Sequence, residues 1–143
     1  MANVTISGVD TLVAALEKAD LFSQETQEEM LFAAGDILVE CIQQEMQRSN
    51  FNIASLERNI YYTRKIKKNK YGEPYISVSV KGKNANGQRN ATIAFVLNYG
   101  RSEDYGEISG GYFWTKGSKT AEPLIFKKIE EIAERRLREG GLL

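Results

Sequence analysis

The longest regular pattern of apolar and polar positions runs from Ser23 to Ser49, and its spacing is that of an α-helix. Ser23 or Thr26 is suited to begin this helix, and the acidic residues that follow fit the positive end of its dipole. The pattern therefore predicts one helix that spans the domain. Its apolar face is formed by Met30, Ala34, Ile37, Leu38, Cys41, Ile42 and Met46.

A second helical pattern lies near the C-terminal end of the sequence. We expect this helix to begin near Pro123, because proline fits the first helical turn, and to end at the glycine pair 140–141. A shorter apolar stripe over residues 12–19 predicts a further helix near the N-terminal end, after an extended piece at residues 4–6.

Two stretches after the long helix have the character of β-strands. Ile60–Lys67 is rich in β-branched and aromatic residues, and Tyr75–Lys81 alternates between apolar and polar positions. Residues 68–74 between them are of turn-forming types, so the two strands should form an antiparallel hairpin. A second turn over residues 83–90, with Asn86-Gly87 at its tip, follows the hairpin.

Thr92–Gly100 is the most hydrophobic strand candidate, since apolar residues occupy both odd and even positions. Such a strand is typical of a sheet covered on both sides, so Phe95→Asp is expected to prevent folding. Tyr112-Phe113-Trp114 is interpreted as a short fourth strand or an aromatic plug, and residues 116–120 as a loop. The fold class is therefore α+β, with an antiparallel sheet of three to four strands packed against the long helix and a C-terminal helix. We expect a single domain over residues 1–143.

The composition offers few groups for catalysis. The sequence contains no histidine, which removes the usual general base and the commonest transition-metal ligand. Ser109 lacks the preceding glycine of a nucleophile elbow, and the acidic residues of segment 103–107 lack the spacing of a calcium loop. Neither a phosphate-binding loop nor a dinucleotide fingerprint occurs. We therefore expect no enzyme activity, no catalytic residue, no cofactor and no metal.

The single cysteine and the apolar runs are also informative. Cys41 lies on the apolar face of the long helix, where a small buried side chain is expected, and a lone thiol cannot form an internal disulfide. No apolar run reaches the roughly 18–20 residues of a membrane span, and no export signal is recognisable. We expect no membrane partner.

The 19 basic and 19 acidic residues balance, but they are segregated along the chain. Residues 10–57 hold ten acids and two bases, a net charge of −8, whereas residues 58–90 hold nine bases and one acid, a net charge of +8. These two blocks can pair within one subunit, pair between neighbouring subunits, or remain solvated.

The strongest local signal lies in residues 61–71, where basic side chains alternate with tyrosines. Phosphate contact combined with base stacking uses such residues. Exposed lysines also protect a strand edge from unwanted pairing, and they can dock on an acidic protein surface. A protein–protein contact, nucleic-acid binding and plain solvation therefore all fit this segment. Its basic residues are Arg64, Lys65, Lys67, Lys68 and Lys70.

Several short phrases resemble the tail-component, or tail-completion, family of long-tailed bacteriophages and prophages. Gly8–Leu16 resembles the family's opening G-L-x-x-L-x-x-x-L, and residues 55–60 partly match its phrase G-x-L-x-x-S-I. Residues 94–101 resemble A-x-x-V-E-F-G-T, and residues 121–125 resemble A-R-P-F-L. The likeness extends over nearly the whole chain.

This resemblance implies a virion structural protein at the head–tail junction, which completes or terminates the tail or connects it to the head. Proteins of this family usually work as rings, expected to be hexameric, around a channel that DNA traverses. The implied partners are further copies of the chain and the phage connector and tail-tube proteins, without specific DNA binding. The implied location is the tail or neck of the virion, with assembly in the bacterial cytoplasm. The alternative is a small nucleic-acid-binding module that uses the basic hairpin.

The expected interface combines two segments. Lysines lining the channel would grip passing DNA, so we expect the basic hairpin to contact the acidic N-terminal region of a neighbouring subunit instead. Residues 98–101 depart from the family phrase at Asn98 and Arg101 and form the second segment. The predicted interface residues are Arg64, Lys65, Lys67, Lys68, Lys70, Asn98, Tyr99 and Arg101.

Overall fold

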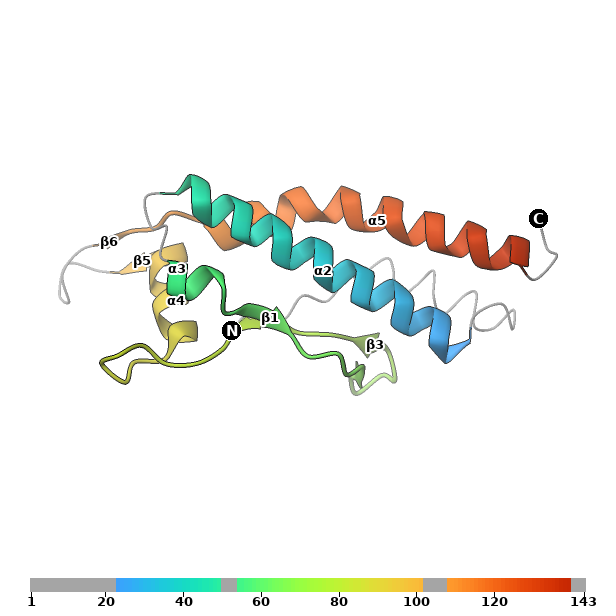
Figure 1. Cartoon of the computed structure of the whole chain (residues 1–143), viewed down its shortest axis with the longest axis horizontal. Helices are drawn as coiled ribbons and strands as arrows, with labels where there is room; N and C mark the ends of the chain where they lie inside the picture. The colour runs from blue at the N-terminus through green and yellow to red at the C-terminus, as the bar shows by residue number, and fades with distance from the viewer. Residues whose placement is uncertain (1–22, 50–53, 102–107, 140–143) are drawn as a thin grey trace.

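The computed structural model describes residues 23–49, 54–101 and 108–139. Two long helices, α2 (Gln24–Arg48) and α5 (Phe113–Glu139), run side by side in opposite directions, and a β-hairpin packs on another face of α2 (Figure 1). A short helix, α3 (Ala54–Glu57), precedes the hairpin, and α4 (Asn90–Tyr99) lies near the start of α5. The core is therefore built mainly between the two long helices.

The long helix predicted over residues 23–49 is confirmed as α2. Its N-terminal cap is Ser23, whose Oγ accepts a hydrogen bond from the backbone N–H of Thr26 at 3.2 Å. The predicted apolar face is buried except at Ile37, which is half-buried. The buried members are Met30, Ala34, Leu38, Cys41, Ile42 and Met46.

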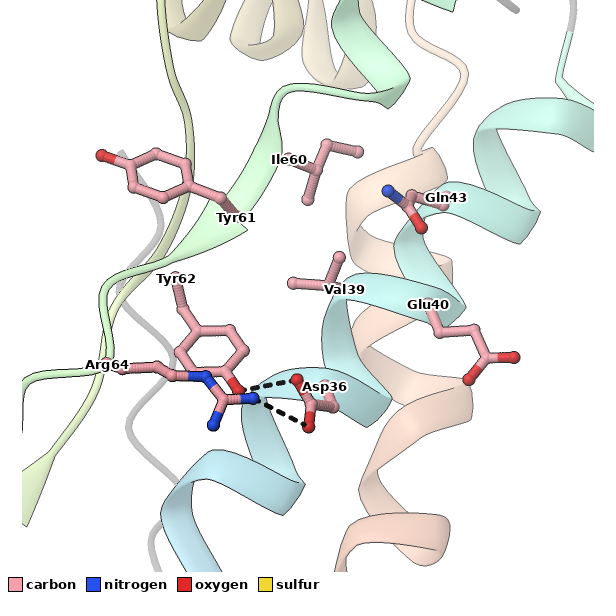
Figure 2. A pocket seen from close by; sticks show the side chains of 8 residues that line it. All are labelled: Asp36, Val39, Glu40, Gln43, Ile60, Tyr61, Tyr62 and Arg64. Carbon is pink, nitrogen blue, oxygen red and sulfur yellow. Dashed lines mark hydrogen bonds and ion pairs between the residues drawn. The ribbon is translucent and has the colours of Figure 1, made fainter. Parts of the chain in front are cut away.

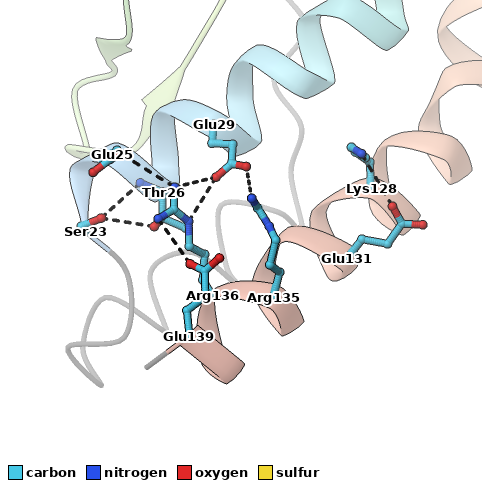
Figure 3. A network of polar contacts seen from close by, with 9 residues as sticks. All are labelled: Ser23, Glu25, Thr26, Glu29, Lys128, Glu131, Arg135, Arg136 and Glu139. Carbon is cyan, nitrogen blue, oxygen red and sulfur yellow. Dashed lines mark hydrogen bonds and ion pairs between the residues drawn. The ribbon is translucent and has the colours of Figure 1, made fainter. Parts of the chain in front are cut away.

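The backbones of the two long helices approach each other closely where Gly117 of α5 meets Ile42 of α2. A Cβ atom added at Gly117 would lie 2.7 Å from the Cα atom of Ile42, so only glycine allows this backbone contact. At the opposite end of the pair, Arg135 and Arg136 of α5 bind the carboxylate of Glu29 of α2, with Arg136 Nη2 at 2.8 Å (Figure 3). Close packing and ion pairs thus join the helices at both ends.

The predicted antiparallel hairpin is confirmed, although its pairing is interrupted. β1 (Ile60–Tyr62) pairs with β4 (Val78–Val80), and β2 (Lys67–Lys68) pairs with β3 (Pro74–Tyr75). Between the two paired regions, the four residues 63–66 lie opposite two residues, 76 and 77. This mismatch divides the hairpin into two short two-stranded sheets.

The prediction of a central strand at Thr92–Gly100 is wrong, because these residues form most of helix α4. Its buried residues recur with helical spacing and are Asn90, Ala91, Ala94, Leu97 and Asn98. The preceding turn is confirmed: Gly87 has a φ of 79°, and Lys83 and Arg89 form an isolated bridge. This turn leads into a helix whose first N–H, that of Asn90, donates to the carbonyl of Gly82 at 3.0 Å.

The sheet of three to four strands is also absent among the described residues. They contain only separate two-stranded pairs, the third of which joins β5 (Gly100–Arg101) to β6 (Ile108–Ser109). Residues 113–114 and 116–120 form neither a strand nor a loop, because α5 already begins at Phe113. Pro123 therefore lies inside that helix rather than in its first turn. The coarser prediction of mixed helices and strands, with one long and one C-terminal helix, holds.

Some predictions lie outside the described residues: the extended piece at 4–6, the short helix at 12–19 and the glycine pair 140–141. In the part of the chain that the structure describes, no helix combines the length and the apolar character that crossing a membrane requires.

Candidate interaction surfaces

The outer part of the hairpin forms a projecting basic segment, residues 64–75, which we call the basic arm. Lys65, Lys67, Lys68 and Lys70 are all exposed, and none of them forms an ion pair with another described residue. Tyr71, at the turn, is 74% exposed, and the ammonium group of Lys70 lies 5.0 Å from the centre of its ring. The arm thus presents positive charge and one aromatic ring to its surroundings.

The turn of the basic arm is held by Asn69. The Asn69 side-chain oxygen accepts hydrogen bonds from the backbone N–H groups of Tyr71 and Glu73, at 2.9 and 3.0 Å. Its amide group donates to the Glu73 carboxylate at 3.0 Å, and Gly72 supplies the φ of 77° that completes the turn. These contacts hold the turn at the end of the arm in a defined conformation.

The base of the arm is joined to α2 at Asp36 (Figure 2). Asp36 accepts a hydrogen bond from the Tyr62 hydroxyl at 2.6 Å and forms an ion pair with Arg64 at 3.9 Å. The Arg64 guanidinium also lies 5.5 Å from the centre of the Phe32 ring. Burial, together with the hydrogen bond to Asp36, raises the pKa of Tyr62 to about 12. Arg64 therefore already has an anionic partner within the chain, whereas the four lysines form no ion pair with the described residues.

A groove of about 290 Å³ lies between α2 and β1. Val39 and Ile60 supply apolar surface, while Asp36 and Glu40 supply carboxylates on consecutive turns of α2. Tyr61 lines the groove at β1, but its ring points away from α2 (Figure 2). The Glu40 carboxylate extends away from Tyr62 and has no ion pair among the described residues (Figure 2). The side-chain amide of Gln44 donates a hydrogen bond to this carboxylate at 3.4 Å. The groove thus combines an apolar floor with an acidic rim.

A second exposed surface is the outer face of α4. Phe95 and Tyr99 are each 53% exposed, and their ring centroids lie 4.9 Å apart. Phe95 therefore does not belong to the core, and the burial on which the expectation for Phe95→Asp rested is absent. Exposed aromatic pairs of this kind are enriched at protein–protein interfaces. Tyr99 is the predicted interface residue that this face contains.

Asn98 does not fit the predicted interface, because it is only 2% exposed. Its side-chain oxygen accepts hydrogen bonds from the backbone N–H groups of Trp114 and Thr115, at 2.9 and 3.4 Å. Asn98 of α4 thus caps the first turn of α5, although it does not adjoin that helix in the sequence. Arg101, the other member of the segment, lies in β5 opposite Ile108.

The acidic N-terminal third of the chain is partly neutralised within the same subunit. Glu25 and Glu29 contact Arg136, and Glu29 also binds Arg135 (Figure 3). The antiparallel arrangement of α2 and α5 places Arg135 and Arg136 beside Glu29. This arrangement has no signal in the sequence. Of the acidic residues on α2, Glu28 and Glu40 have no ion pair among the described residues.

Groups that carry chemistry are few in the described residues. Cys41 is buried, and burial, with Glu40 and Glu45 nearby, raises the pKa of its thiol. No group of three or more Cys, Asp or Glu side chains suited to a metal ion occurs within the described ranges. Comparisons of the chain with protein-family models, with curated proteins and with solved structures found no match.

Proposed function

We propose that this chain is a structural component of a phage or prophage tail at the head–tail junction, where it acts by ring self-assembly and docking without catalysis. The observation that carries the proposal is the basic arm. Its turn is rigidly held, yet its four lysines and Tyr71 have no partner in the core. A preformed exposed arm of this kind favours docking, because little conformational freedom is lost when it binds.

The exposed aromatic face of α4 supports the same proposal. Phe95 and Tyr99 are not needed to complete the core, and they lie on a different element from the basic arm. Two unlike surfaces on one subunit permit head-to-tail contacts between copies, and such contacts close into rings when the rotation between subunits allows it. The sequence resemblance to phage tail components supplies the biological setting.

The wild-type chain is expected to assemble into rings of identical subunits, which native mass spectrometry and negative-stain imaging would detect. Replacing Lys65, Lys67 and Lys68 with glutamate should weaken assembly, because the arm would then repel an acidic neighbour. The control reverses two exposed lysines of α5, Lys116 and Lys119, and should leave the mass unchanged. A wild type that remains monomeric at high concentration would contradict the proposal.

The second candidate function is nucleic-acid binding by the same arm. It is favoured by the combination of an exposed tyrosine with four lysines that form no ion pair with the described residues, since phosphate contacts and base stacking use these groups. If the arm binds DNA, titrations at increasing salt should give a steep log–log slope that reports several phosphate contacts. If the arm is a subunit contact, we expect negligible DNA binding at physiological salt.

A further inference from the structure

We infer that the groove between α2 and β1 receives the tip of the basic arm of a second copy of this chain. The tip consists of Lys68, Lys70 and Tyr71. This inference rests on the proposed function, because it assigns the two surfaces that meet when subunits assemble.

The chemistry of the groove matches that of the tip. Its floor offers Val39 and Ile60 to an aromatic ring, and its rim on α2 carries the carboxylates of Asp36 and Glu40. Asp36 is already bound to Tyr62 and Arg64, whereas the exposed carboxylate of Glu40 has no cation among the described residues. Glu40 is therefore the group that a lysine from outside would bind.

The tip supplies the complementary groups. Tyr71 is the most exposed of the large hydrophobic side chains, and Lys70 lies against its ring. An aromatic side chain that enters a groove with a basic residue beside it combines the apolar and charged contacts typical of binding hot spots. Because Asn69 fixes the turn, the ring and the lysines are presented together.

The tip that enters the groove does not come from the same subunit. Arg64, at the base of the arm, lines the groove, whereas the tip begins at Lys68, the last residue of β2. The strand paired with β2, β3, lies beyond β1 in the direction of the N-terminal end of α2 (Figure 1). The tip of a subunit therefore lies away from the groove of the same subunit. A second copy can provide an identical tip, and the contact is then head to tail.

The decisive experiment exchanges the charges between the two surfaces. One variant carries Lys68→Glu and Lys70→Glu, which makes the tip acidic, and the other carries Glu40→Lys, which makes the rim basic. Each variant alone should need about a tenfold higher concentration than the wild type to assemble, because like charges then meet. An equimolar mixture should assemble at nearly the wild-type concentration. The acidic tip of the first variant then meets the basic rim of the second, and the basic tip of the second meets the acidic rim of the first. Mass photometry over a concentration series measures these shifts.

Matched variants separate this contact from general charge effects. Glu130→Lys makes the same charge change at an exposed position of α5 and should leave assembly unchanged. Tyr71→Ala should weaken assembly in the wild-type background, whereas Tyr71→Phe should preserve it because the ring remains. Thermal unfolding should be unaffected in all these variants, because the replaced side chains are exposed.

The outcomes distinguish this inference from the proposed function. If the wild type assembles and the charge variants assemble equally well, the groove is not the receptor, and the proposed function stands. If each variant is impaired but the mixture is not restored, the two surfaces do not meet, and the inference is overturned. A monomeric wild type overturns both.

Discussion

Gly117→Leu is expected to destabilise the protein by about 3 kcal/mol or more, because the new side chain would collide with the backbone of α2. The added Cβ atom alone would lie 2.7 Å from the Cα atom of Ile42 and 2.9 Å from its nitrogen. Backbone atoms cannot turn aside as a flexible side chain can, so the two long helices would have to separate. For a domain of this size, the midpoint of thermal unfolding should fall by about 10 °C, as circular dichroism would show.

Two controls sharpen this test. Lys119→Leu places the same side chain at an exposed position of the same helix and should change the midpoint little. Gly35→Ala should cost less than Gly117→Ala, because the neighbours of Gly35 are side-chain atoms of Ile76 and Tyr62. If Gly117→Leu unfolds at the wild-type temperature, the helix packing described above is incorrect.

Asn98→Ala is expected to lower the free energy of unfolding by about 2–3 kcal/mol. The change removes the cap of α5 and leaves a buried backbone N–H, that of Trp114, without its acceptor. Urea denaturation should show the midpoint shifted downward by about 1 M, with the slope unchanged. The loss should appear as instability of the monomer, not as a selective defect of assembly, because the side chain is buried.

Asn98→Asp is the matched variant. Aspartate keeps an oxygen that can accept from Trp114 and Thr115, and its negative charge suits the N-terminal end of a helix. We therefore expect a smaller loss than for alanine at neutral pH. Equal losses for the two variants would argue against capping by this side chain.

The features that the sequence predicted correctly are those with local signals. α2 has a long, regular apolar face and a capping serine, and both survive unchanged in the fold. The hairpin has a polar turn between two β-rich stretches, and Asn69 and Gly72 form that turn as their residue types suggest. The exposure of the lysines in the basic arm follows from the same local pattern.

The interpretation of residues 92–100 failed for a physical reason. Isoleucine, phenylalanine, valine and tyrosine favour strands when nothing else decides. The aromatic residues Phe95 and Tyr99 lie on the exposed face of α4, which masks the helical spacing of the buried positions. The helix also has no local capping signal, because the side chain of its N-cap residue, Arg89, forms no hydrogen bond with the first turn. Contacts with residues 81 and 82 hold its start instead.

The start of α5 was missed for a related reason. Its first turn is capped by Asn98, which belongs to another helix. Gly117 suggests a loop in the sequence, whereas in the fold it allows the backbone of α2 to pack against α5. For the same reason, Asn98 was predicted to be an interface residue, because the sequence does not reveal that this side chain is buried.

The sequence by itself therefore determined the long helix, the hairpin with its basic arm, and the segregation of charge, since each is written in neighbouring residues. Only the tertiary structure decided that residues 90–99 are helical, that α5 begins at Phe113, and that the groove beside Asp36 and Glu40 exists. In each of these cases, backbone groups or side chains are satisfied by residues outside the element itself, from residues 81 and 82 for the start of α4 to another helix for the start of α5. Local propensities cannot anticipate such partners, because the partners become neighbours only when the chain folds.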